Sequence, residues 1–320
     1  MKDKVPGNNP LVSIVVTTYN SAKYVLETLE SCKNQTYENI ELVITDDASD
    51  DQTVKICEEW LSKNKERFSG VKIVRAETNS GISPNLNRGV HAAKGEWVKT
   101  VAGDDILLPN CVADYIDFIH ETDDDAKLLA SRVISFRVDE HGNRIETRDS
   151  PNDVVFNRSL TARDQYELTL RTVSVSVISI FFLRSSFLEI GGCDERFPMY
   201  EDKPLLINYL RSGTKYYYLN KFTFMRRMHS ESITGKSGLI VSSWKINSFY
   251  PVHFEYVYND LKLFEKAAFR YEYYVHLLLF RLKFKKNITY HNIFSKLLRV
   301  PSVLLEKLSK KLIINKVKKG

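Results

Sequence analysis

The sequence contains no long apolar run. Nowhere does it approach the roughly 20 consecutive apolar residues that a helix needs to cross a bilayer. The segment from Met1 to Pro10 is polar and lacks the apolar core of a signal peptide. Cysteine is scarce as well, since the chain has 4 cysteines in 320 residues and no C-x-x-C pair among them. This spacing argues against a zinc site or a disulfide framework, so we expect a cytoplasmic protein with reduced thiols.

Acidic residues are nearly absent from the last part of the chain. Residues 281–320 contain 12 Lys or Arg and 1 Glu, a net charge of +11, which leaves −5 of the overall +6 for residues 1–280. A basic tail on a mildly acidic body is typical of a protein that contacts an anionic surface. The same distribution predicts no nucleic-acid partner.

The basic tail also has an amphipathic pattern. Within residues 301–319, one helical side carries Leu304, Leu305, Leu308, Leu312 and Ile313, and lysines surround the other side. Such a helix can lie in a membrane interface. We therefore expect peripheral contact with an anionic membrane through residues 281–320, at the inner face of the cell membrane. The alternative is a helix packed on the rest of the protein with a solvated lysine face.

The chain from residue 11 to 102 alternates between strand-like and helix-like segments. Short runs rich in β-branched residues predict strands at 11–18, 40–45, 71–76 and 96–102, and helical periodicity marks 21–35, 50–64 and 83–95. The last of these helices is expected to begin with a Ser83 cap and Pro84 at its first position. This alternation implies right-handed crossovers and predicts an α/β fold with a mainly parallel sheet.

Polar groups follow all four predicted strands. They are Thr17 to Asn20, Asp46-Asp47, Asn79 to Gly81, and Gly103 to Asp105. Open parallel sheets bind their ligands outside the carboxyl ends of the strands, so we expect all four groups at one edge of the sheet.

Beyond residue 110 the alternation weakens. The patterns predict a strand and a turn over 127–146, a strand at 175–184, a helix at 201–212, two short strands over 215–227, and helices from about 240. We expect this half to extend the sheet and to form the second wall of a cleft.

Two adjacent carboxylates, Asp104 and Asp105, close the fourth predicted strand. Like charges at this spacing repel, unless a cation lies between them. Mg²⁺ and Mn²⁺ are held by one or two carboxylates together with substrate phosphates, so the pair is a candidate metal site. A capped turn before the helix at 110 is the alternative.

Other acidic residues have two readings each. Asp47 would accept hydrogen bonds from a nucleobase or ribose, or else belong to a solvated loop, while Asp50 or Asp51 would cap the next helix. The run at 123–125 is expected to be solvated surface.

Glu201 and Asp202 open a predicted helix, where carboxylates act as caps or, if one is near a reacting hydroxyl, as a general base.

A cationic cluster, Arg226 to His229, follows the last predicted strand pair. It is either a surface patch or a diphosphate clamp.

Five strings of the sequence together resemble glycosyltransferase family 2, whose fold is GT-A. They are VSIVVTTYN, ITDDASDD, NSGISPNLNRG, AGDDILLP, and MYEDKPLLINYLRSG followed by RRMH, and they lie roughly between residues 10 and 235. The similarity is to bacterial enzymes that build O-antigen and capsular polysaccharide. It implies a GT-A (Rossmann-like) catalytic domain over 1–235 and a helical, basic C-terminal region over 236–320.

The resemblance implies a role for each matching residue. Thr17 and Tyr19 match the segment that contacts the nucleotide base, Asp47 matches the base-reading aspartate, and Asn87 matches an asparagine that backs the nucleotide. Asp104 and Asp105 match the D-x-D-type motif, with Asp105 as the metal ligand. Asp202 matches the catalytic base, supported by Glu201, and Arg227 and His229 match an R-x-H segment near the diphosphate. Gly103 departs from the family, many of whose members have a more polar residue there.

The implied activity is a metal-dependent, inverting transfer of one sugar. A nucleotide-diphosphate sugar, with UDP favoured, would donate to a hydroxyl of a glycan acceptor that is polyprenyl-linked, and Mn²⁺ or Mg²⁺ would be the cofactor. The Q-x-x-R-W motif of processive synthases is absent. Two alternatives stay open: a sugar-nucleotide-binding or scaffold subunit without transfer activity, and a nucleotidyltransferase.

Overall fold

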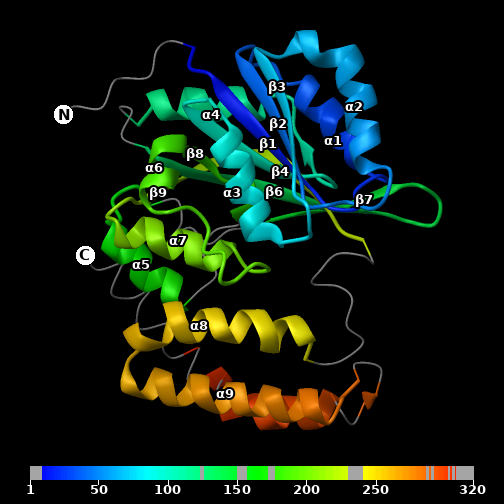
Figure 1. Cartoon of the computed structure of the whole chain (residues 1–320). Helices are drawn as coiled ribbons and strands as arrows, with labels where there is room; N and C mark the ends of the chain where they lie inside the picture. Colours follow the sequence, from blue (N-terminus) through cyan, green and yellow to red (C-terminus); the bar gives the residue numbers. More distant parts are fainter. Residues whose placement is uncertain are drawn as a thin grey trace. The chain divides into compact units, whose positions relative to one another are not determined.

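Figure 1 shows the computed structural model of the chain, which describes residues 9–122, 126–149, 157–171, 177–229 and 241–285, and parts of 288–307. The acidic run at 123–125 and most of 301–319 lie outside the described residues. The chain forms two compact units, one of residues 1–162 with 175–228 and the other of 163–174 with 229–320.

The first unit is built on a parallel sheet, as the sequence predicts. β1 (Val12–Thr18), β2 (Ile40–Asp46), β3 (Gly70–Arg75) and β4 (Trp97–Ala102) pair in the order β3-β2-β1-β4, all parallel. β1, β2 and β4 are buried along almost their whole length, which explains their continuous β-branched runs.

The second half continues the same sheet in mixed orientation. β4 is followed by β8 (Phe181–Leu183), β6 (Leu128–Val138), β9 (Tyr216–Arg227) and β5 (Ile106–Leu107), and β7 (Arg144–Arg148) pairs with β6. β8 is antiparallel to β4 and to β6, whereas β6 and β9 are parallel. The strand and turn predicted over 127–146 are confirmed as β6, a turn and β7.

Two strand predictions in this half were right only in part. Among the described residues of the strand predicted at 175–184, Val177–Ser179 form a short 3₁₀ turn and the three residues of β8 form a strand. The two strands predicted over 215–227 are one strand, β9, whose pairing with β6 shifts register at Ser131–Val133. Such a shift accommodates extra residues and bends a strand without ending it.

Helices cover both faces of the sheet, and strand alternation decides which residues they meet. On one face, α1 (Val25–Lys33), α2 (Thr53–Asn64) and α4 (Cys111–His120) form a core with Val12, Ile14 and Val16 of β1. On the other face, α3 (Ile82–Ala92) packs so closely that a Cβ on Gly89 would lie 2.5 Å from Val15 Cγ1. α6 (Arg184–Glu189) and α7 (Asp202–Arg211) complete the unit, with a 3₁₀ turn at Lys65–Arg67.

The start of α3 differs from the prediction. Gly81, with φ of 98°, occupies the cap position, and the helix begins at Ile82. Ser83 does not cap, because its hydroxyl donates to the carbonyl of Phe197 at 2.9 Å. Pro84 still lies in the first turn, where its missing N–H costs no helical hydrogen bond.

The second unit is helical in its described part. It contains residues 163–171 of α5 (Ala162–Arg171), a π-helical turn at Lys245–Phe249, α8 (Tyr250–Tyr256), a 3₁₀ turn at Tyr258–Asp260, α9 (Leu263–Arg281) and a helical segment at 292–301. Arg171 of α5 donates two hydrogen bonds to Glu265 of α9, at 2.7 and 3.0 Å, and both side chains are buried. No helix among the described residues has the length and apolar character to cross a membrane.

Candidate active site

The carboxyl ends of the parallel strands meet at one edge of the sheet. Thr18 at the end of β1 is in register with Asp46 at the end of β2, and Thr17 is in register with Ala102 at the end of β4. The N–H of Gly103 donates to the carbonyl of Thr17 at 2.8 Å. The polar groups that follow β1, β2 and β4 therefore lie together.

Asp47 organises the loop that precedes α3. Its Oδ2 accepts hydrogen bonds from the N–H groups of Ser80 at 3.0 Å and Gly81 at 2.7 Å, and its Oδ1 accepts from Ser80 Oγ at 2.7 Å. Arg88 of α3 also lies 3.3 Å from Oδ1. A buried carboxylate with this many donors holds the loop in one conformation. Its predicted contact with a nucleotide base stays a prediction.

Thr17 and Tyr19 flank this edge. Thr17 is half-buried, and Tyr19 has half its surface exposed, 50%, in the turn after β1. An exposed aromatic ring at a ligand edge is available for stacking.

Asp105 is a buried carboxylate in the turn after β4. Its Oδ1 accepts a hydrogen bond from the main-chain N–H of Arg227 at 2.8 Å, and its carbonyl accepts one from Thr28 Oγ1 at 2.8 Å. Burial raises the pKa of Asp105 to about 7, and the neighbouring charge of Asp104 adds to the shift. Gly103 precedes the pair because a Cβ there would lie 2.9 Å from Thr18 Cγ2 and 3.1 Å from Ser21 Cβ.

Arg227 holds this turn with its side chain as well. Its Nε donates to the carbonyl of Asp104 at 2.9 Å, and its Nη2 donates to the carboxylate of Glu27 on α1. The guanidinium lies 4.6 Å from the ring centroids of both Tyr24 and Phe136. The group predicted to contact a diphosphate is thus engaged by a carboxylate and two rings.

We define the Glu27 clasp as Glu27, Arg144 and Arg227. Arg144 of β7 donates to the other oxygen of the Glu27 carboxylate, so one carboxylate bridges two arginines. The clasp ties α1, β7 and β9 to the Asp104–Asp105 turn.

Arg226, the neighbour of Arg227, points to the opposite side of β9 because side chains alternate along a strand. Its charge lowers the pKa values of both Asp105 and Asp202, against the burial that raises them. Its half-buried side chain makes no hydrogen bond or ion pair with any residue that the structure describes. Sequence reasoning placed Arg226 in a cationic cluster but gave the diphosphate role to Arg227.

Glu201 and Asp202 start α7, with Asp202 as its first residue. Within the described part of the chain, Asp202 Oδ1 is buried and has no hydrogen-bond partner. Burial raises the pKa of Glu201 well above its usual range, and the charge of Asp202 adds to this. Burial also raises the pKa of Asp202, while a hydrogen bond with Glu201 and the charge of Arg226 oppose it. This favours a proton on Glu201 and an ionised Asp202.

Asn87 of α3 anchors the segment that leads to this pair. Its Nδ2 donates to the carbonyl of Cys193 at 2.9 Å and to Glu195 Oε1 at 2.8 Å, and its Oδ1 accepts from the N–H of Cys193 at 2.8 Å. At the start of α3, the N–H of Ser83 donates to the carbonyl of Pro198 at 3.1 Å. The sequence gave no sign of this anchoring, because the partners are 106 residues apart.

His229 follows β9 by two residues, is half-buried, and belongs to the second unit. Its predicted place beside a diphosphate stays a prediction.

The residues at the edge suit a divalent cation that shares its ligands with a substrate. No group of three or more His, Cys, Asp or Glu in the described part of the chain could hold a metal ion by itself. Asp105 Oδ2 accepts no hydrogen bond from described residues, and Asp104 stands next to it. An open carboxylate oxygen on Asp105, with a second carboxylate adjacent in the chain, matches the way Mg²⁺ and Mn²⁺ bind alongside substrate phosphates.

Comparison with known proteins gives one family. The model of the family "Glycosyl transferase family 2" matches residues 13–190, more than half of the chain. The matched range contains β1 to β4, the Asp104–Asp105 turn and the β6–β8 part of the sheet.

Relatives and solved structures agree with this match. A glycosyltransferase of Streptococcus pneumoniae serotype 4, GlyG, is 34% identical over 115 residues, which cover 36% of this chain and 37% of that protein. The putative glycosyltransferase EpsH of Bacillus subtilis is 39% identical over 101 residues, 32% of this chain and 28% of the relative. The matched part of the chain therefore spans about a third of the length of these relatives. The crystal structure of S. aureus TarS 1–349 in complex with UDP-GlcNAc is similar with a TM-score of 0.60 at 21% identity, covering 83% of this chain and 72% of that one.

Proposed function

Because the chain belongs to glycosyltransferase family 2, we propose that it transfers a single sugar from a nucleotide-diphosphate sugar to a hydroxyl of a glycan acceptor. The observation that carries the proposal is the charge arrangement at the strand edge. Arg226 acts electrostatically on two separate carboxylates, Asp105 at the end of β4 and Asp202 at the start of α7. A cation whose charge acts on both a metal-type carboxylate and a base-type carboxylate suits a diphosphate leaving group.

The donor is proposed to be a UDP-sugar. Support comes from the fold shared with TarS, whose structure contains UDP-GlcNAc. Tyr19 would stack on the base, and Asp47 with its fixed loop would border it. Thr17 and Asn87 lie on the elements that back this side of the edge.

Asp105, with Asp104, would hold Mn²⁺ or Mg²⁺. When bound, such an ion neutralises charge that develops on a leaving diphosphate. Arg226 would add fixed positive charge close to the same phosphates, in a partly buried site where electrostatic stabilisation is strong.

Asp202 would act as the general base. Its unpartnered oxygen can accept a proton from the attacking hydroxyl, and a protonated Glu201 keeps Asp202 in the ionised form that a base needs. One direct displacement then moves the sugar with inversion at the anomeric carbon. No covalent nucleophile is required.

The acceptor is proposed to be a lipid-linked glycan of a surface polysaccharide, of the O-antigen or capsule kind. The basic residues in 281–320 would then hold the enzyme at the cytoplasmic face of the membrane. Contact with anionic lipid is part of this proposal.

A panel of nucleotide sugars tests the function. Nucleotide release from each donor, with and without acceptor and Mn²⁺, should single out one donor whose release depends on the acceptor. Binding without any release, across all donors and acceptors, would instead indicate a sugar-nucleotide-binding subunit.

A further inference from the structure

An exposed apolar stripe runs along the helical segment at 292–301 and the residues after it. Ile293, Leu297, Val300 and Leu304 follow one another at helical spacings of four, three and four. Their exposed fractions are 54%, 64%, 48% and 61%. Residues at this spacing share one helix face, so the stripe is continuous.

The opposite side of the same segment is already packed. Ser295 is buried, and Leu298 contacts the small core of Val241, Val275 and Leu279. The carbonyl of Leu298 accepts a hydrogen bond from Tyr271 of α9 at 2.8 Å. The segment thus has its intramolecular face, and the exposed stripe is a second apolar face.

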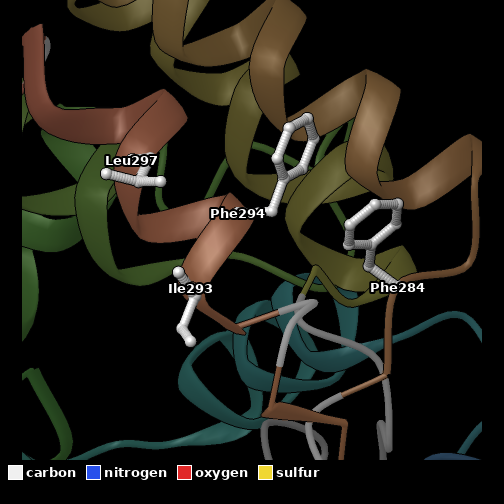
Figure 2. A pocket seen from close by; sticks show the side chains of 4 residues that line it. All are labelled: Phe284, Ile293, Phe294 and Leu297. Atoms are coloured by element: carbon white, nitrogen blue, oxygen red, sulfur yellow. The ribbon is translucent and has the colours of Figure 1, made fainter.

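The stripe borders an apolar hollow. Figure 2 shows Phe284, Ile293, Phe294 and Leu297 around a pocket of about 420 Å³. The rings of Phe284 and Phe294 are stacked, with their centroids 5.8 Å apart. All four lining side chains are apolar, and three of them are exposed.

Every charged residue that the structure describes within the segment 281–307 is basic. Between residues 281 and 307 these are Arg281, Lys283, Lys285, Lys296, Arg299 and Lys307. Arg299 is paired with Glu272 at 3.2 Å. Lys296 and Lys307 each lie three residues after a member of the stripe, Ile293 and Leu304, and so flank it on the helix surface.

We propose that this apolar–basic face, made of Ile293, Phe294, Leu297, Val300 and Leu304 with Lys296 and Lys307, inserts into the interface of an anionic lipid bilayer. The charges select the occupant. A second copy of the chain would present a face of the same positive charge, and the two faces would repel each other. A nucleic acid would leave the apolar stripe in contact with water. An anionic bilayer offers apolar depth and negative headgroups together.

This inference specifies which residues make the membrane contact proposed above. It rests on the proposed function only for the biological role of that contact, because lipid binding does not require sugar transfer. The contact surface also differs from the one that the sequence predicts, because the stripe begins at Ile293, before the helix predicted within residues 301–319.

Vesicle flotation with the full chain tests it. The wild type should float with vesicles of phosphatidylcholine and phosphatidylglycerol, and much less with phosphatidylcholine alone. Leu297→Ser with Leu304→Ser should weaken partitioning by about tenfold to a hundredfold, since two leucine side chains no longer leave water. Leu263→Ser is the matched control, because Leu263 is an exposed leucine, 87%, at the start of α9 and outside the face.

Two further variants complete the design. Lys296→Glu with Lys307→Glu should abolish the preference for anionic vesicles while leaving the melting temperature unchanged. A truncation after Lys307 should keep most of the binding. If the truncation removes all binding while the leucine double variant keeps it, the surface lies in 308–320 and the inference is overturned.

Light scattering tests the remaining alternative, in which a second copy of the chain covers this face. A wild type that dimerises, and a leucine double variant that is monomeric without any change in flotation, would assign the face to a second copy and overturn the inference. Failure of the proposed function looks different: no donor is turned over, yet flotation follows the pattern above. Transfer to a water-soluble acceptor should be the same in all these variants.

Discussion

The main-chain N–H of Arg227 donates to Oδ1 of Asp105 at 2.8 Å, so the end of β9 holds the carboxylate at the end of β4. The side chain of Arg227 repeats the attachment through the carbonyl of Asp104. The acidic turn is therefore fixed by a residue 122 positions away. The same arginine depends on the Glu27 clasp, and this dependence has measurable consequences.

Removing the carboxylate of the clasp should destabilise the first unit. Glu27→Gln leaves the buried Arg227 guanidinium without its carboxylate, and because Glu27 is partly exposed we expect a loss of about 1–2 kcal/mol. Urea unfolding measures the change. Glu58→Gln, an exposed glutamate on α2, is the control and should stay within about 0.5 kcal/mol of the wild type. A stable Glu27→Gln variant would mean that the clasp does not hold the turn.

Substitutions of the two adjacent arginines, Arg226 and Arg227, should affect different properties of the protein. Arg226→Ala should raise the KM for the donor and lower kcat with little change in stability, because its side chain contacts no described partner. Arg227→Ala should lower stability, because it breaks the clasp. Steady-state kinetics and urea unfolding on the same preparations distinguish the two, and the reverse pattern would return the diphosphate role to Arg227.

Replacing the proposed base should slow transfer without loss of donor binding. Asp202→Asn keeps the shape of the side chain but cannot take a proton, and loss of a general base typically costs about 10²–10⁴ in rate. Isothermal titration with the donor should give an unchanged affinity. Turnover at the wild-type rate would remove Asp202 from the chemistry.

Donor binding should no longer depend on the metal ion when a neutral residue replaces Asp105. In Asp105→Asn, Mn²⁺ should no longer tighten donor binding, and chelator should have no further effect. The variant should also melt higher than the metal-free wild type at pH 8, because burial and Asp104 raise the pKa of Asp105 to about 7 and its charge is unfavourable above that pH. Thermal shift with and without Mn²⁺ reads both effects. A wild-type response to Mn²⁺ would contradict the metal assignment.

A buried lysine should give the protein a pH-dependent stability. Lys99 in β4 is fully buried, donates to the carbonyl oxygens of Thr100 at 2.6 Å and Ile178 at 3.2 Å, and has its pKa lowered by burial to about 8. Between pH 8 and 10.5 the unfolded chain keeps a proton that the folded chain has released, so stability rises with pH. The full gain is about 3 kcal/mol.

The measurement is the difference between the wild type and Lys99→Met. Urea unfolding at pH 8, 9 and 10 should show a rise for the wild type relative to the variant. The comparison cancels the contribution of a buried thiol that Lys99 does not affect, such as Cys57, whose pKa burial raises. Parallel curves for the two proteins would show that Lys99 does not titrate in this range.

Individual strands and helices show how much of the fold could be predicted from the sequence. β1, β2 and β4 were predicted within a residue or two, because a buried parallel strand has a continuous β-branched run that needs no partner to be recognised. β8 and β9 were misjudged, because a three-residue strand has no period and a register shift resembles a break. Ser83 looked like a cap because its competing partner, Phe197, lies more than a hundred residues later.

The sequence by itself determined that polar groups gather at one edge of a parallel sheet, since strand–helix alternation and right-handed crossovers depend only on local patterns. It also determined that an acidic pair closes the fourth strand. Only the tertiary structure decided that the charge of Arg226 acts on both carboxylates while Arg227 binds Glu27. It also decided that Asn87 holds the segment before Asp202 and that Lys99 is buried. Each of these depends on contacts between segments far apart in the chain, and such contacts leave no pattern in either segment alone.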